Sequence, residues 1–180
     1  KTAYEIRNCD WSSDVCSSDL FRYQAEGMVR DGLRLGLAGD HQLVNAAVAL
    51  QLVDMLPETL KCSEVAIREG LLAARNRGRL EWLAPDLLVD GAHNPDGATV
   101  LALHLSRLPH DRPRTLLLGG GTDKDIRSVA ATLAPRVDRI VTTACDHPKA
   151  RSPEAIAAEI AGLPVPIAVG GPLENALAAV

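Results

Sequence analysis

The chain has 180 residues, of which 47% are hydrophobic, 23% are charged and only 3% are aromatic. This composition is typical of a globular protein and argues against a disordered chain. With so few aromatic residues, Leu, Val, Ile and Ala are expected to build the core. The formal net charge of −4, without a cluster of Lys and Arg, argues against a nucleic-acid-binding protein. The longest apolar stretch, within residues 43–56, is too short and too polar to cross a membrane.

Residues 1–20 differ from the rest of the chain. The run from Trp11 to Leu20 repeats Ser-Ser-Asp and has neither helical nor strand periodicity, and the chain begins without Met. We interpret residues 1–20 as a foreign leader, similar to a translated sequencing adaptor. A polar native loop is the alternative. The segment is left out of the fold prediction, as a fusion scar would be.

Residues 21–77 predict strands followed by helices. Loosely alternating apolar residues over 21–37, with turn signals at Gly27 and Gly32, indicate one or two short antiparallel strands. Asp40 is expected to cap a helix over residues 41–56, which Pro57 ends. Ser63 is expected to cap a second helix over residues 64–75.

From residue 78 onward, apolar runs alternate with amphipathic helical patterns. The runs are residues 87–89, 115–118, 139–143 and 166–169. The helical patterns cover residues 95–107, 125–133, 153–160 and 173 onward. This alternation predicts an α/β fold in which helices cover a parallel sheet. Right-handed crossovers would place the strand-to-helix loops at one edge, where open α/β sheets bind ligands. The last helix stops at Val180, which we interpret as a truncated end.

The run from Asp90 to Gly97 is the strongest candidate for a functional loop. Asp90 directly follows an apolar run, so its carboxylate would lie at the end of a strand, where it could bind ribose hydroxyls or the water of a metal. Asn94 and Pro95 suit the cap and first position of a helix. A capped turn would explain these two residues but not Asp90 and His93, and we therefore favour a functional loop.

Two weaker clusters come earlier in the chain. His41 and Asn45 would share one face at the start of a helix, where the Asn45 amide could bind a purine. Spacing alone favours a helix start with incidental polar residues. Arg79, after the flexible Gly78, could make a bidentate contact with phosphate, or it could pair with Glu81 at the surface.

Two further clusters follow later apolar runs. The three glycines of residues 119–121 would let the backbone approach a ligand, with Lys124 supplying positive charge. The loop fits neither the Walker A motif nor the dinucleotide fingerprint, and a flexible turn that ends in a capping Asp125 is equally compatible. Lys149 and Arg151 could bind an anionic substrate, although solvated loop charges are the more expected role.

Taken in order, these motifs resemble the folylpolyglutamate synthase/dihydrofolate synthase branch of the Mur ligase superfamily over residues 21–180. The motifs are Leu37-Ala38-Gly39-Asp40-His41-Gln42 with Asn45-Ala46, Gly78-Arg79-Leu80-Glu81, Asp90-Gly91-Ala92-His93-Asn94-Pro95 and Asp123-Lys124-Asp125. The resemblance implies a Rossmann-like C-terminal domain over residues 78–180, with a mostly parallel sheet between helices. Residues 21–77 would be a remnant of the central ATP-binding domain.

The resemblance also implies a reaction and its residues. ATP and Mg would serve to phosphorylate a folate or dihydropteroate carboxylate, and the amino group of L-glutamate would attack the acyl phosphate. Asn45 would contact adenine, Arg79 phosphate and Asp90 the nucleotide, while His93 would lie near the incoming glutamate. Asp90 and His93 would be the catalytic residues. The P-loop and the metal ligands of the family are absent from this sequence, so we expect no activity from the chain alone.

The cysteines and the residues before Gly78 lead to further expectations. The four cysteines show no close metal-ligand spacing, and we expect a reduced, cytoplasmic, monomeric protein without nucleic-acid or membrane partners. Asn76-Arg77 stands where the family often has Trp-Pro before the Gly-Arg pair, so hinge packing is expected to differ. The alternatives are another Mur-type amino-acid ligase of cell-wall synthesis and a non-catalytic nucleotide-binding module.

Overall fold

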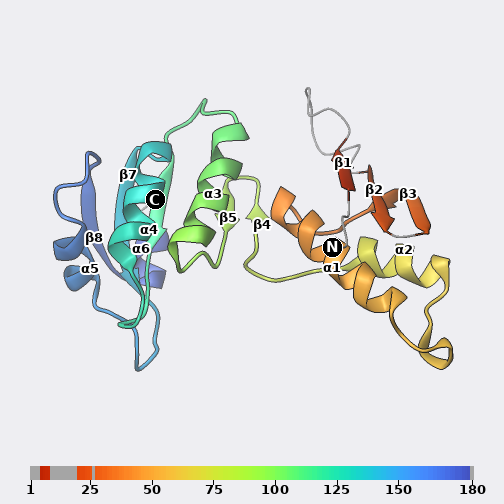
Figure 1. The fold of residues 1–180 in the computed structure, drawn as a ribbon. Helices are drawn as coiled ribbons and strands as arrows, with labels where there is room; N and C mark the ends of the chain where they lie inside the picture. The colour runs from red at the N-terminus through yellow and green to blue at the C-terminus, as the bar shows by residue number, and fades with distance from the viewer. Residues whose placement is uncertain (1–4, 9–19, 26, 179–180) are drawn as a thin grey trace. The chain divides into compact units, whose positions relative to one another are not determined.

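A computed structural model describes residues 5–8, 20–25 and 27–178. The chain divides into two compact units, Lys1–Asp90 and Gly91–Val180 (Figure 1). Most of the leader predicted over residues 1–20 lies outside the described residues. Leu20, which that prediction included, is the first residue of a strand.

The first unit begins with an antiparallel sheet in the order β1-β2-β3. Its strands are β1 (Glu5–Asn8), β2 (Leu20–Ala25) and β3 (Met28–Arg34). Gly27 lies at the turn between β2 and β3 with a φ of 74°, a backbone conformation that glycine adopts without strain. The antiparallel strands predicted over residues 21–37 are therefore confirmed.

Two helices pack on this sheet. They are α1 (Asp40–Asp54) and α2 (Glu64–Ala73), with the short 3₁₀ helix η1 (Glu58–Leu60) between them. The hydroxyl of Ser63 accepts a hydrogen bond from the Ala66 amide at 3.2 Å, as its predicted capping role requires. The predicted cap at Asp40 is wrong. Gly39 takes the cap position with a φ of 97°, and Asp40 is already the first helical residue.

The core of the first unit contains a buried charge, Arg30. Its guanidinium donates to both carboxylate oxygens of Asp54, at 2.8 and 2.6 Å, and to Glu64 at 2.9 Å. It also lies 5.8 Å above the ring of Tyr23. A buried guanidinium requires such partners. Arg30 therefore ties β3 to α1 and α2. The apolar core around it consists of Phe21, Tyr23, Leu33, Ala46, Ala47, Leu50 and Ile67.

A separate hairpin closes the first unit. Strands β4 (Glu81–Ala84) and β5 (Leu87–Val89) pair antiparallel in a two-stranded sheet. The run 87–89 was predicted as a strand of the parallel sheet, and that prediction is wrong. The Pro85-Asp86 turn folds the run back onto β4 instead.

The second unit is an α/β layer structure. Its parallel sheet has the order β6-β7-β8, formed by β6 (Thr115–Leu118), β7 (Arg139–Ala144) and β8 (Ile167–Pro172). Its helices are α3 (Pro95–Arg107), α4 (Ile126–Leu133), η2 (Ala134–Arg136), α5 (Pro153–Ile160) and α6 (Leu173–Ala178). The predicted parallel α/β sheet is confirmed, with three strands instead of four.

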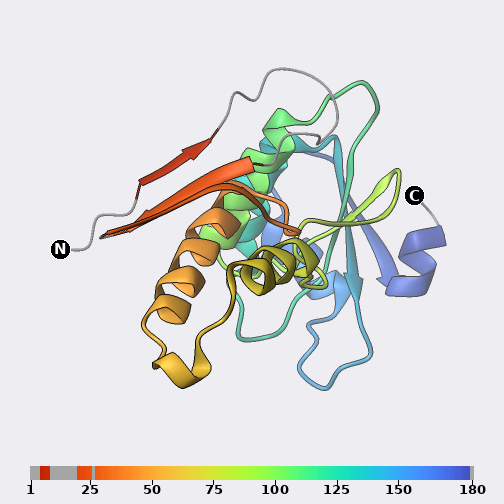
Figure 2. The ribbon, with the colours of Figure 1, turned by 90° about the vertical axis from the view of Figure 1, so that its right-hand side faces the viewer.

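The helices cover both faces of this sheet. Helix α3 packs on α4, and α4 on α5, whereas α6 lies on the face opposite α4 (Figures 1 and 2). The buried side chains between the layers are Ile126, Val129, Leu133, Ile140, Val141, Ile156 and Ile160. Because the strands are parallel, the loops that follow β6 and β7 leave the sheet at the same edge. No helix in the described part of the chain is long and apolar enough to cross a membrane.

Candidate active-site loops

Asp90 follows β5 and holds the backbone of the preceding segment. Its Oδ2 accepts a hydrogen bond from the amide of Leu80 at 2.9 Å. Leu80 is 3% exposed and has a φ of 46°, a region that costs a residue with a side chain conformational energy. The carboxylate therefore stabilises a strained residue next to Arg79. No local pattern in the sequence predicts this contact, which spans ten positions.

His93 is exposed on the loop before α3. Its Nδ1 lies 2.8 Å from the carbonyl oxygen of Gly91. Because a carbonyl oxygen can only accept, Nδ1 carries the proton in this contact, and Nε2 of the neutral ring is an acceptor. Asn94 caps α3 by accepting from the amide of Gly97 at 2.8 Å, and Pro95 is the first helical residue, as predicted.

Arg79 is half-buried, and the structure removes one alternative for it. Glu81, the expected surface partner, instead accepts a hydrogen bond from the amide of Gly78 at 2.7 Å. Within the described part of the chain, the guanidinium of Arg79 has no hydrogen-bond or ion-pair partner. A half-buried guanidinium in this situation fits an anion such as phosphate.

Asn45 is exposed on α1, and a neighbour orients its amide. The Nδ2 group of Asn45 donates to Oε1 of Gln42 at 2.9 Å, and Gln42 is 5% exposed. The His41 ring lies against Gly39, where a Cβ atom would be only 2.8 Å from the ring. Glycine at position 39 thus gives room for the His41 ring at the start of the helix.

The two polar clusters after β6 and β7 lie side by side. The amide of Thr122 donates to the carbonyl of Lys149 at 3.0 Å, and Gly121 pairs with Ala150 in an isolated bridge. Asp125 caps α4 by accepting from the amide of Ser128 at 3.0 Å, as one alternative predicted. Backbone hydrogen bonds thus join two loops that are separated in sequence by α4 and β7.

Side chains in these two loops are paired in different ways. Lys124 lies 3.1 Å from Asp123, and its hydrogen bond lowers the pKa of that carboxyl. Arg151 pairs with Glu159 of α5 and donates to the carbonyls of Thr122 and Lys124, at 3.2 and 3.1 Å. Arg151 is therefore not a solvated charge, because its guanidinium binds the loop after β6 and helix α5.

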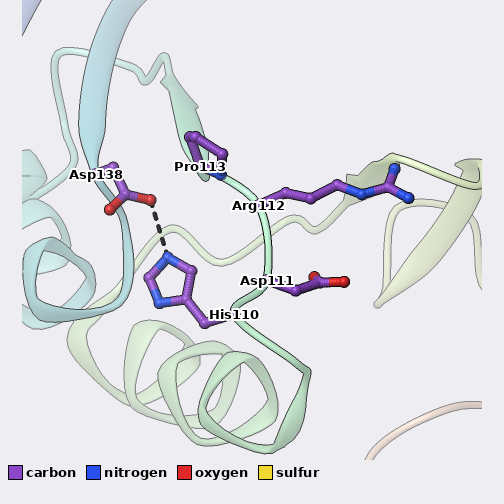
Figure 3. Close-up of a pocket in the computed structure, with 5 residues that line it drawn as sticks. All are labelled: His110, Asp111, Arg112, Pro113 and Asp138. Carbon is purple, nitrogen blue, oxygen red and sulfur yellow. Dashed lines mark hydrogen bonds and ion pairs between the residues drawn. The ribbon is translucent and has the colours of Figure 1, made fainter.

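A shallow pocket lies near the opposite edge of the parallel sheet, where β6 and β7 begin (Figure 3). His110 lies 2.9 Å from Asp138, whose carboxylate also accepts from the amide of Arg114 at 2.6 Å. These bonds, led by the Arg114 amide, lower the pKa of Asp138. None of the residues predicted for the active site lines this pocket, and its contacts hold the turn between α3 and β6.

Comparisons with known proteins identify relatives of this chain. Residues 78–180 match a family model described as "Mur ligase, glutamate ligase domain". The chain is 34% identical over 146 residues to dihydrofolate synthase/folylpolyglutamate synthase of Mycobacterium tuberculosis, which covers 77% of this chain and 29% of that protein. It is 31% identical over 175 residues to UDP-N-acetylmuramoyl-L-alanyl-D-glutamate--2,6-diaminopimelate ligase of Rhizobium meliloti, covering 89% and 35%.

A solved structure agrees with the fold. The folylpolyglutamate synthase of Mycobacterium tuberculosis complexed with ADP and AMPPCP superposes with a TM-score of 0.75 at 30% identity. The match covers 91% of this chain and 38% of that one. The chain thus spans about a third of the length of each of these proteins.

Proposed function

Because the chain belongs to the family of the Mur ligase glutamate ligase domain, we propose that it is the part of an ATP-dependent amide ligase that receives L-glutamate. The acceptor would be a folate or dihydropteroate carboxylate, the chemistry named for the Mycobacterium tuberculosis relative. The observation that carries this proposal is the family match over residues 78–180, a range that contains the loop from Asp90 to Pro95.

The first unit would contribute to nucleotide binding. When bound, ATP supplies the phosphoryl group that turns a carboxylate, a poor acyl donor, into an acyl phosphate. The half-buried guanidinium of Arg79 suits a phosphate oxygen, and the oriented amide of Asn45 suits an adenine edge. Asp90 would contact the nucleotide while it holds the amide of Leu80, and nucleotide binding would thereby couple to the conformation of Leu80, the residue after Arg79.

His93 would act on the amino group of the incoming glutamate. With Nδ1 donating to Gly91, the neutral ring offers Nε2 as an acceptor for an ammonium proton. Removal of that proton leaves the amine lone pair that attacks the activated carboxylate. Among the described residues, no group of three or more His, Cys, Asp or Glu could hold a metal ion.

A chimeric ligase tests the proposal. This chain would replace the matching region of the Mycobacterium tuberculosis relative, and phosphate release would be measured with ATP, dihydropteroate or folate, and L-glutamate. We expect glutamate-dependent turnover, which Asp90→Ala and His93→Ala should lower. Full activity in either variant would contradict the role given to that residue. The 180-residue chain alone contains no Walker A sequence and should show no glutamate-dependent ATP turnover.

A second candidate substrate comes from the Rhizobium meliloti relative, which is a ligase for a UDP-linked muramoyl peptide. The chain is 31% identical to that protein over 175 residues. Turnover of a UDP-muramoyl peptide with diaminopimelate, without turnover of folate substrates, would assign the chain to this branch. Binding of a nucleotide without turnover of either substrate would instead support a non-catalytic module.

A further inference from the structure

The loops that follow β6 and β7, residues 119–125 and 145–152, are joined to each other at the carboxyl edge of the parallel sheet, the edge at which open α/β sheets generally bind ligands. Two backbone hydrogen bonds join them. Thr122 donates to Lys149 at 3.0 Å, and Arg151 donates through its amide to Gly120 at 2.9 Å. Two such bonds between exposed loops leave the ends of the loops able to separate unless side chains add to them.

The side chain of Arg151 supplies the additional contacts. Its Nη2 group donates to the carbonyls of Thr122 and Lys124, and its Nη1 group pairs with Glu159 on α5. The side chain of Arg151 is 17% exposed, so water screens these contacts only partly. A guanidinium presents five donors in one plane, whereas an ammonium presents one compact charge. Lysine could keep the pair with Glu159 but not both carbonyl contacts.

These contacts fix the positions of two cationic residues. Lys124 accepts from Arg151 through its carbonyl, and Lys149 accepts from Thr122 through its carbonyl. Both lysines act on the carboxyl of Asp123, whose pKa they lower. The backbones of Lys124 and Lys149 are therefore held close together at the carboxyl ends of β6 and β7, and the ammonium of Lys124 lies 3.1 Å from the carboxylate of Asp123.

We propose that Arg151 is a positioning residue for the amino-acid substrate. It holds the two loops, and with them Lys124 and Lys149, in the arrangement that receives the carboxylates of L-glutamate. The identity of the substrate in this inference rests on the proposed function. The positioning of the loops rests on the contacts of Arg151 alone.

Hydrogen exchange of the 180-residue chain tests the positioning. Arg151→Met should speed exchange of the amides in residues 119–125 by about tenfold, the loss expected for a hydrogen bond to a charged group. Exchange within β7 should not change. Arg127→Met is the matched control, because Arg127 donates to the carbonyl of Glu159 at 2.7 Å, a contact that lies outside both loops. Unchanged loop exchange in Arg151→Met, or an equal effect of Arg127→Met, would overturn the proposal.

Titration with L-glutamate tests the link to the substrate. Amide chemical shifts of Gly119, Gly120 and Gly121 would be followed in the same chain. We expect the Kd for L-glutamate to rise about tenfold in Arg151→Met, to rise less in Arg151→Lys and to stay unchanged in Arg127→Met. An equal Kd in Arg151→Met would overturn the proposal. If glutamate shifts no amide in the unaltered chain, the assigned substrate is wrong, and the exchange experiment still decides the positioning of the loops.

Discussion

Asp90 carries both a structural contact and a proposed catalytic one. Its carboxylate accepts from the amide of Leu80, which is buried and has a positive φ. Removal of the carboxylate in Asp90→Ala leaves that amide without this acceptor. We therefore expect the free energy of unfolding to fall by about 1–3 kcal/mol. Urea denaturation of the 180-residue chain measures this difference.

His93 provides the comparison for Asp90. His93 is exposed, and within the described part of the chain its ring bonds to the nearby carbonyl of Gly91 alone, so His93→Ala should change the free energy of unfolding by less than about 0.5 kcal/mol. Asp90→Asn keeps an oxygen that can accept from Leu80, and it should retain most of the stability. Equal stabilities of Asp90→Ala and the unaltered chain would show that the contact with Leu80 contributes nothing.

Residues with strong local preferences were predictable from the sequence. Ser63, Asn94 and Asp125, which were expected to cap helices, each accept from an amide three residues later at the start of a helix. The cap at Asp40 was predicted one residue too late. Asp is preferred over Gly at the cap position, but here Gly39 occupies it, with a backbone conformation that suits glycine. The bonds of Asp90 and Arg151 join distant positions, and no local pattern contains them.

At the scale of elements, α2 contains a residue poorly suited to a helix. Gly70 lies inside α2, and a Cβ atom there would meet nothing within 4 Å. Gly70→Ala should therefore stabilise the chain by about 0.5–1 kcal/mol, because alanine loses less backbone entropy on folding. Gly27→Ala is the control. It also adds a Cβ to open space, but at a φ of 74° it should destabilise. Thermal unfolding measures the Tm of both variants. A higher Tm in both would contradict the expected difference between the two glycines.

Arg30 joins β3 to α1 and α2, and its contribution to the free energy of unfolding depends on pH. The hydrogen bonds of Arg30 lower the pKa of Asp54. A lowered pKa in the folded state gives stability that is present above the unfolded value of about 3.9 and is lost as the pH falls through the folded value. In Arg30→Met, the partly buried Asp54 carboxylate has no guanidinium, and we expect the free energy of unfolding to fall by about 3–5 kcal/mol at pH 7.

Acid should narrow that difference. Protonation removes the cost of an unpaired Asp54 in Arg30→Met and weakens the ion pair in the unaltered chain. Urea unfolding at pH 7 and pH 3.5 would therefore show the larger gap between the two proteins at pH 7. A gap of equal size at both pH values would mean that the Asp54 pair does not determine the effect of Arg30.

Elements with clear periodicity were found in the sequence, and the short hairpin was not. The bounds of α3, α5 and β6 agree with the predicted ranges. β4 has only four residues, and Trp82 and Leu83 are about half exposed, so it lacks the alternation that marks a strand. Without β4, the run 87–89 had no visible antiparallel partner. Its apolar residues therefore predicted another buried parallel strand.

For the whole molecule, the two units have separate cores, and we expect perturbations to stay within each. Arg30→Met acts on the core around Tyr23 and Leu33, and Ile140→Ala would open a cavity around a residue that is 0% exposed in the second unit. The cavity should cost about 2–5 kcal/mol. Distant sites without shared partners behave additively. Hydrogen exchange should therefore become faster in residues 20–73 for Arg30→Met and in β6, β7 and β8 for Ile140→Ala.

The double variant Arg30→Met/Ile140→Ala tests whether the two units unfold separately. If the units unfold separately, the exchange rates of each unit in the double variant equal those of the corresponding single variant. If instead the chain unfolds as one cooperative body, either substitution speeds exchange in both units, and the slowest amides of both follow a common rate. Separate behaviour would make residues 91–180 a unit whose loops can be studied with the first unit destabilised. The roles given to Arg151 and His93 could then be measured apart from those given to Asn45 and Arg79.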